Sequence, residues 1–119
     1  MSRNTIILGP IPDLFTRYLL CREGEKFYVI ADYRCDTYEK IVEIYYLQEN
    51  QIEGGGFIVY DDLRDQPYPI KFYGSSRRYL AANHTKAIEV AKEDVQKFAR
   101  EHWGDKYASA PFEAEFEGC

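Results

Sequence analysis

Residues Ile41 to Tyr60 read IVEIYYLQENQIEGGGFIVY, and the architecture predicted for the chain depends on this stretch. Two runs rich in β-branched and aromatic residues, 41–47 and 57–60, flank a polar segment that contains three consecutive glycines, 54–56. This pattern is typical of two antiparallel strands joined by a glycine-rich turn. The sequence therefore predicts that residues 41–60 form the central hairpin of an antiparallel sheet.

Both faces of the first predicted strand are largely apolar. At a period of two, one face carries Val42, Ile44 and Tyr46, and the other carries Ile41, Glu43, Tyr45 and Leu47. A sheet with one face in water normally alternates apolar with polar residues, so this hairpin should be covered on both sides. The chain itself offers one cover, a C-terminal helix, and we expect the second cover to come from a partner.

The longest helical pattern in the chain predicts a helix from about Thr85 to Trp103. Apolar residues recur at helical spacing on one side of it, and charged residues occupy the other side. Thr85 suits the N-cap position, and Gly104 stands where a glycine commonly ends a helix. An alternative makes residues 87–90 a strand and starts the helix near Lys92. We expect the longer helix to pack across one face of the sheet.

Shorter apolar runs predict the remaining strands. Residues 5–8 suit an edge strand that ends before Pro10 and Pro12. Residues 17–22 and 26–33 suit a hairpin that turns at residues 23–25, although residues 13–20 also fit a helical turn. Residues 70–73 suit one more short strand.

These elements predict an α+β fold, in which a meander-like antiparallel sheet of about five strands carries one long C-terminal helix on one face. The length of 119 residues suits a single domain, which we assign to residues 1–104. Residues 105–119 form an acidic tail. We expect this tail either to add an edge strand or to be disordered.

The charge of the chain limits its partners. A net charge of −5 argues against direct nucleic-acid binding, which needs a basic surface, and against binding to an anionic membrane. No apolar run is long enough to span a bilayer, and the N-terminal run is too short for a secretory signal. We therefore expect a cytoplasmic protein.

The residues that commonly carry catalysis or hold metals are few and scattered. Cys21, Cys35 and Cys119 lack the spacing of a metal site or a disulfide framework, and His84 and His102 have no ligand-type residues at suitable spacing. We expect Cys21 and Cys35 to be reduced core residues and Cys119 to be exposed. No pairing of a nucleophile with a base is visible, so we expect no metal and no cofactor and favour a non-catalytic protein, without excluding catalysis.

The best candidate for a ligand site is the segment 74–79, which reads GSSRRY. Hydroxyl and guanidinium groups can donate hydrogen bonds to a phosphate or carboxylate, and a tyrosine ring can stack on a planar ligand. The segment matches neither a Walker loop nor a dinucleotide fingerprint, and a solvated turn is the simpler alternative. The residues that would bind the anion are Ser75, Ser76, Arg77, Arg78 and Tyr79.

Three functions are compatible with these features. The first is a small cytosolic binding or accessory protein that forms a homodimer, or binds another protein, through its apolar, tyrosine-rich sheet face. The second is a protein that binds a phosphorylated small molecule such as a nucleotide, or acts on it as a simple enzyme, through residues 74–79. The third is an acidic inhibitor of a nucleic-acid-binding protein, in which Glu113, Glu115 and Glu117 mimic phosphates. The interface expected for the first function consists of Tyr28, Ile30, Tyr45 and Leu47.

Overall fold

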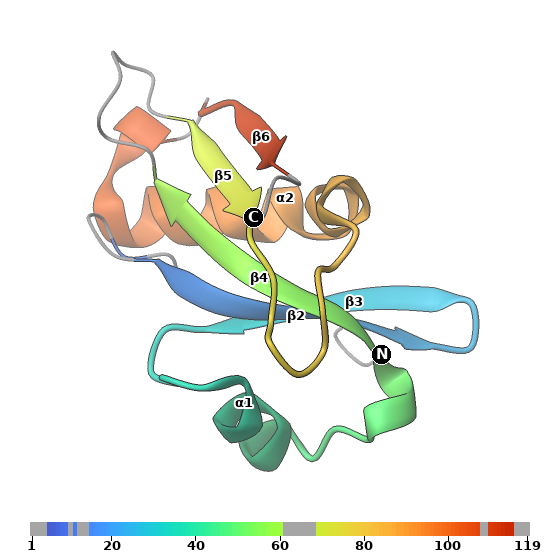
Figure 1. The fold of residues 1–119 in the computed structure, drawn as a ribbon. Coiled ribbons are helices and arrows are strands. Elements are labelled where there is room, and N and C mark those ends of the chain that lie inside the picture. The colour runs from blue at the N-terminus through green and yellow to red at the C-terminus, as the bar shows by residue number, and fades with distance from the viewer. Residues whose placement is uncertain (1–4, 10, 12–14, 61–68, 108–109, 116–119) are drawn as a thin grey trace.

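The computed structural model describes residues 5–9, 11, 15–60, 69–107 and 110–115 of the chain. Within these residues the chain forms a six-stranded sheet with one α-helix on each face (Figure 1). The elements follow in the order β1 (Ile6–Leu8), β2 (Thr16–Glu23), β3 (Lys26–Asp32), α1 (Tyr38–Tyr45), β4 (Ile52–Tyr60), β5 (Ile70–Tyr73), α2 (His84–Trp103) and β6 (Phe112–Glu115). Short 3-10 turns at Glu49–Gln51 and Asp105–Tyr107 precede β4 and follow α2.

The sheet has the spatial order β1-β3-β2-β4-β5-β6 and is mixed. Its four central strands pair antiparallel, whereas β1 runs parallel to β3 and β6 runs parallel to β5. The predicted α+β class and C-terminal helix are confirmed, but the purely antiparallel sheet of about five strands is wrong. Helix α2 causes part of the difference, because it carries the chain back across the sheet and lets β6 run in the direction of β5.

Residues 41–47, predicted as a strand, instead belong mainly to helix α1. The Thr37 side chain caps this helix by accepting a hydrogen bond from the Lys40 backbone N–H at 3.1 Å. The helix ends at Tyr45, and its C-cap residue Tyr46 has a left-handed φ of 54° and is 90% exposed. Tyr38, Ile41, Val42 and Tyr45 recur at helical spacing and pack on the second face of the sheet.

Gly54–Gly56, predicted as part of a turn, lie within strand β4 and pair with β2. Residues 80–82 run against this part of the strand, since the Gly55 N–H donates to the Leu80 carbonyl at 2.9 Å. A Cβ atom at position 54 would lie 2.7 Å from the Ala82 backbone, and one at position 56 would lie 2.6 Å from the His84 ring. The glycines are therefore needed for close packing of residues 80–84 on β4.

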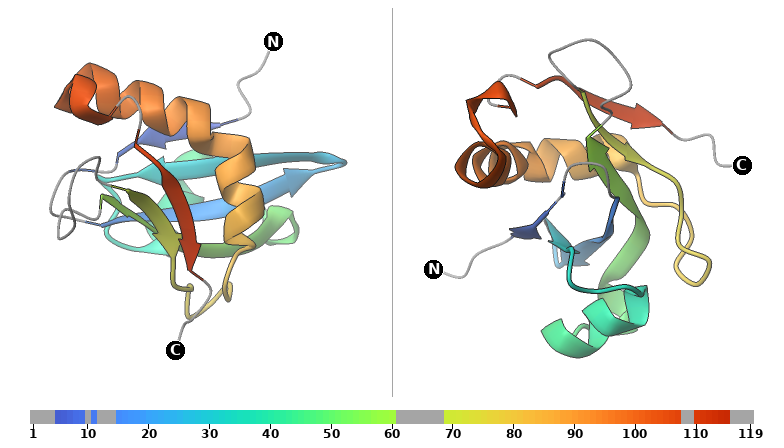
Figure 2. Two further views of the ribbon diagram at one scale, coloured as in Figure 1. Left: turned by 90° about the horizontal axis from the view of Figure 1, so that it is seen from above. Right: turned by 90° about the vertical axis from the view of Figure 1, so that its left-hand side faces the viewer.

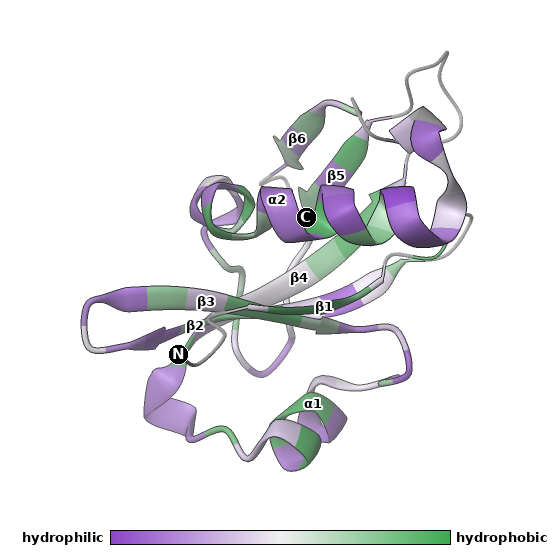
Figure 3. Cartoon of the chain, turned by 180° about the vertical axis from the view of Figure 1, so that it is seen from behind, coloured by the Kyte–Doolittle hydropathy of each residue, from purple (hydrophilic) through white to green (hydrophobic). Residues whose placement is uncertain are grey.

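Helix α2 covers the first face of the sheet, as Figure 2 shows from above and from one side. Asn83, not Thr85, is its N-cap, and the alternative strand at residues 87–90 is wrong. Hydrophilic and hydrophobic residues alternate along the helix (Figure 3). Its buried residues join a large apolar core with those of the sheet, including Tyr18, Leu20, Val29, Ile58, Phe72, Ala91, Val95 and Phe98.

The predicted first strand and first hairpin are confirmed as β1 and as β2 with β3. Residues 112–115 of the acidic tail form the edge strand β6. Pro10, Pro12 and Cys119 lie outside the described residues. Within the described part of the chain, no helix is both long and apolar enough to cross a membrane.

Candidate functional site

An open cleft of about 610 Å³ lies on the α1 side of the sheet. Arg17 of β2 and Phe57 of β4 belong to the sheet and form its base, residues 36–39 at the start of α1 form one wall, and residues 75–78 form the other. Four of the five predicted ligand-binding residues, Ser75 to Arg78, therefore line one cleft. The fifth, Tyr79, is not among its lining residues and packs against the apolar cluster beneath α1.

The segment from Ser76 to Leu80 is a closed loop. The backbones of these two residues exchange hydrogen bonds of 3.2 and 2.9 Å, and the Ser76 Oγ accepts one from the Tyr79 N–H at 3.0 Å. Ser76 is only 2% exposed, whereas Ser75 is exposed. The Ser76 hydroxyl thus orders the loop, and Ser75 is the serine that is open to a ligand.

The two adjacent arginines have different environments. Arg78 forms an ion pair with Glu49, and its guanidinium carbon lies 5.6 Å from the centroid of the Tyr79 ring. The hydrogen bond to Glu49 is the main cause of the raised pKa of Arg78. No carboxylate among the described residues pairs with Arg77, which is exposed at the cleft wall. Of the two, Arg77 has more hydrogen-bonding capacity left for an anion.

Arg17, which the sequence did not single out, lines the base of the cleft. Its guanidinium carbon lies 5.3, 5.8 and 5.7 Å from the ring centroids of Phe15, Tyr38 and Phe57, a cation–π arrangement. The side chain is half-buried, and no carboxylate of the described ranges forms an ion pair with it. One signal was available: Arg17 directly precedes the apolar run 18–21 of β2, whose two faces are both covered.

The α1 wall of the cleft carries carboxylates. Asp36 and Glu39 are both exposed and flank the capping residue Thr37. Tyr38 is buried between them and the sheet, and its hydroxyl donates to the Gly56 carbonyl at 2.8 Å. Burial raises the pKa of Tyr38, so this phenol stays neutral and structural. The cleft therefore presents guanidinium groups on its base and loop wall and carboxylates on its helix wall.

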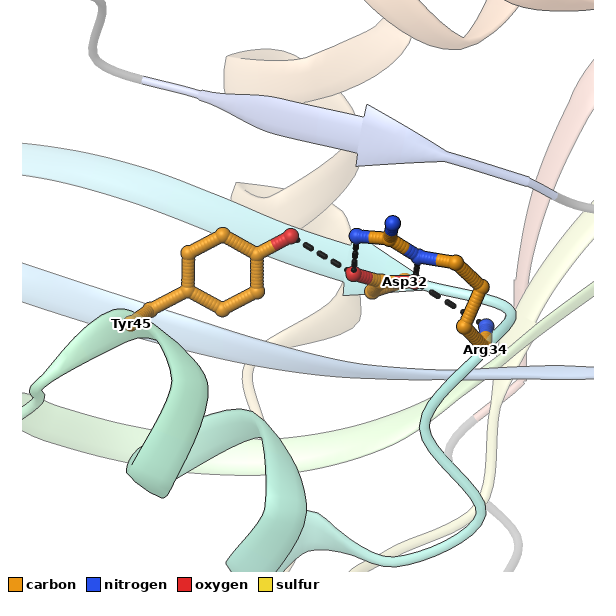
Figure 4. A network of polar contacts seen from close by, with 3 residues as sticks. All are labelled: Asp32, Arg34 and Tyr45. Atoms are coloured by element: carbon orange, nitrogen blue, oxygen red, sulfur yellow. Dashed lines mark hydrogen bonds and ion pairs between the residues drawn. The ribbon is translucent and has the colours of Figure 1, made fainter.

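The buried Asp32 carboxylate binds the Tyr45 hydroxyl at the end of α1 and also pairs with the exposed Arg34 (Figure 4). Asp32 is fully buried and accepts hydrogen bonds from the Arg34 Nε and Nη2 atoms, at 2.9 and 2.7 Å, and from the Tyr45 hydroxyl at 2.6 Å. Burial by itself would raise the pKa of Asp32, but the Arg34 and Tyr45 hydrogen bonds hold it below its ordinary value. Asp32 is therefore a charged clamp with its hydrogen bonds satisfied within the chain.

The four residues predicted as a protein interface pack together inside the chain. Ile30 is buried, Tyr28, Tyr45 and Leu47 are half-buried, and all four belong to the apolar cluster between the sheet and α1. Tyr45 lies on α1 and Leu47 follows it, so neither belongs to the sheet. Because the chain covers this face itself, the physical reason for expecting an outside partner there no longer holds.

His84, His102 and Cys21 lie outside the lining of the cleft. The Tyr18 hydroxyl donates to Nδ1 of the buried His84, whose Nε2 donates to the Gly74 carbonyl at 2.8 Å. Burial lowers the pKa of His84 and raises that of the buried Cys21 thiol to about 12. The His102 Nδ1 atom forms a hydrogen bond of 3.0 Å with the Phe98 carbonyl. In the part of the chain that the structure describes, no cluster of three or more His, Cys, Asp or Glu side chains is arranged to hold a metal ion.

The glutamates proposed as phosphate mimics lie on or beyond β6. Glu115 forms an ion pair of 3.0 Å with Lys71 on the neighbouring strand. Glu113 is half-buried on the same short strand, and Glu117 lies outside the described residues.

No family model matches this chain, and a search of curated proteins finds no match either.

Proposed function

We propose that the protein binds a small phosphorylated molecule in the cleft between α1 and the loop 75–78. The observation that carries this proposal is the position of Arg17. Its guanidinium lies at the base of the cleft against three aromatic rings and has no carboxylate partner in the described ranges. A phosphate seated there would receive charge-assisted hydrogen bonds in partly desolvated surroundings, where such bonds are strong.

The loop wall supplies further donors to the same position. Arg77 and Ser75 are exposed on it, and both face a volume of about 610 Å³, which lies within the range of small-molecule sites, roughly 300–1,000 Å³. Arg78 contributes less, because Glu49 already pairs with it. We therefore rank the arginines in the order Arg17, Arg77, Arg78 for their effect on binding.

Binding without catalysis fits the residues of the cleft best. Its lining contains neither histidine nor cysteine among the described residues, and the hydroxyl of its buried Tyr38 donates a hydrogen bond to a backbone carbonyl.

The cytoplasmic location and the homodimer remain predictions from the sequence. Light scattering at micromolar concentration tests the dimer, which predicts twice the mass of the chain.

Thermal unfolding in the presence of phosphorylated compounds tests the proposed function. Ligands that bind only the folded protein raise Tm, and a concentration of 100 Kd adds about 2.7 kcal/mol of stability. We expect sugar phosphates or nucleotides to stabilise the wild type. Arg17→Met, which keeps the apolar stem, should abolish this stabilisation.

Arg22→Met is the matched control for this experiment. Arg22 lies on the same strand, also approaches a ring, that of Phe27 at 5.8 Å, and does not line the cleft. Its substitution should leave ligand stabilisation unchanged. If no phosphorylated compound raises the Tm of the wild type, the proposed function is wrong.

A further inference from the structure

We infer that the ligand is a sugar phosphate, a phosphorylated polyol, rather than a nucleotide; this inference rests on the proposed function and specifies its ligand. Three features of the cleft lead to it. They are the guanidinium at its base, the carboxylates on its helix wall, and the occupied faces of its aromatic rings.

The base and the helix wall have opposite charges. Arg17 offers N–H donors to a phosphate, whereas Asp36 and Glu39 would repel a second anionic group. Carboxylates accept hydrogen bonds from hydroxyl groups, as they do from ribose hydroxyls in dinucleotide-binding folds. A ligand that complements both sides therefore carries a phosphate at one end and several hydroxyl groups at the other.

Glu39 is exposed on the helix wall of the cleft, and the loop 75–78 forms the other wall. Hydroxyl groups of a ligand that spans the two walls would lie between Glu39 and this loop.

A nucleotide base would find no free ring on which to stack. The two aromatic residues that line the cleft within the described part of the chain, Tyr38 and Phe57, both lie under the Arg17 guanidinium. Tyr38 is also buried, and Phe57 contacts Phe15 and Tyr73. Tyr79, which we expected to stack on a ligand, carries Arg78 on its ring. Since stacking supplies much of the affinity for a base, these contacts favour a ligand without one.

Calorimetric titration with four probes tests the inference. The probes are ribose 5-phosphate, butyl phosphate, inorganic phosphate and adenosine monophosphate. We expect ribose 5-phosphate to bind about tenfold more tightly than butyl phosphate, which corresponds to one hydrogen bond to a charged acceptor. Adenosine monophosphate should bind no more tightly than ribose 5-phosphate.

Variants assign these differences to residues. Glu39→Ala should remove the preference for ribose 5-phosphate over butyl phosphate, whereas Glu43→Ala, an exposed change on the same helix outside the cleft, should not. Arg17→Met should weaken all four probes, and Arg17→Lys, which keeps a charge, should restore part of the binding.

The outcomes separate the inference from the proposed function. Equal affinity for ribose 5-phosphate and butyl phosphate, with binding that still depends on Arg17, overturns the sugar phosphate and leaves the phosphate site. Tighter binding of adenosine monophosphate than of ribose 5-phosphate also overturns it and identifies a nucleotide. Absence of binding by every probe refutes the proposed function together with the inference.

Discussion

The two faces of the sheet are covered in different ways. On one face, the 20-residue helix α2 packs mainly through small and apolar side chains, such as Ala91, Val95 and Phe98. On the other face, the eight-residue helix α1 buries only Tyr38 and Ile41. Hydrogen bonds from Tyr38 and Tyr45 to the sheet complete this second attachment.

This difference places the proposed binding cleft on the side of the domain whose helix buries fewer residues. An isolated helix as short as α1 is marginal in water, so its position depends on its few contacts with the sheet. The cleft lies beside this helix, and its walls belong to α1 and to the closed loop after β5. Binding regions commonly belong to the less stable parts of a fold. Here the cleft lies beside α1, whereas α2 on the opposite face buries more residues.

The largest expected effect is the loss of stability when either of two neighbouring leucines of β2 is replaced by alanine. Leu20 points to the α2 core and Leu19 to the α1 cluster, and both are fully buried. Each substitution by alanine should cost about 2–5 kcal/mol in the free energy of unfolding, with Leu20→Ala at the upper end because its core is larger. Urea denaturation measures both costs.

Hydrogen exchange sharpens the same comparison. Leu19→Ala should increase exchange mainly in the amides of α1, whereas Leu20→Ala should increase it throughout the sheet and α2. A Leu19→Ala protein with unchanged exchange in α1 would contradict a separately attached helix.

The second effect concerns the charged clamp of α1. Tyr45→Phe removes one hydrogen bond to the buried Asp32 carboxylate and should cost about 1.5–3 kcal/mol. Because the pKa of Asp32 is lowered by folding, its contribution is present above about pH 4 and is lost as the pH falls through the folded value. Acid denaturation curves of wild type and Asp32→Asn should therefore converge at low pH, and parallel curves would exclude this role.

The smallest effect is a pH dependence on the α2 side. Because the pKa of His84 is lowered in the folded protein, the unfolded chain binds its proton first, near pH 6.5. This contribution to stability is complete above pH 6.5 and declines as the pH falls towards the folded pKa. In His84→Gln, the loss of unfolding free energy between pH 7 and pH 5 should be smaller than in the wild type. A loss equal to that of the wild type would show that His84 does not contribute.

The sequence predicted the elements whose signals are local and long. Helix α2 has five turns of amphipathic spacing and a polar cap, and the β2–β3 hairpin has two strands joined by a short turn at Gly24. Helix α1 was missed because its eight residues are rich in β-branched and aromatic side chains, which favour strands. Tyr38 and Ile41 complete a helical repeat with Val42 and Tyr45, but the repeat is too short to outweigh that preference.

Contacts between distant segments explain the other failures. Gly54–Gly56 fit a turn by composition, and only the approach of residues 80–84 shows why a strand needs them. Residues 75–79 were predicted as an anion site from residue types alone, because serine and arginine carry donors in their own side chains, and anion binding there stays a prediction. Arg17 was missed, since its role depends on rings contributed by Tyr38 of α1 and Phe57 of β4.

The central claim is that the cleft beside α1, and not the α2 side, binds a phosphorylated ligand. The most direct test is a titration of the ¹⁵N-labelled protein with ribose 5-phosphate, followed in amide and arginine Nε–H spectra. We predict saturable shifts in residues 36–39 and 75–78 and at the Arg17 Nε–H, with α2 unaffected. Shifts confined to α2, or spectra that do not change at millimolar ligand, would contradict the account.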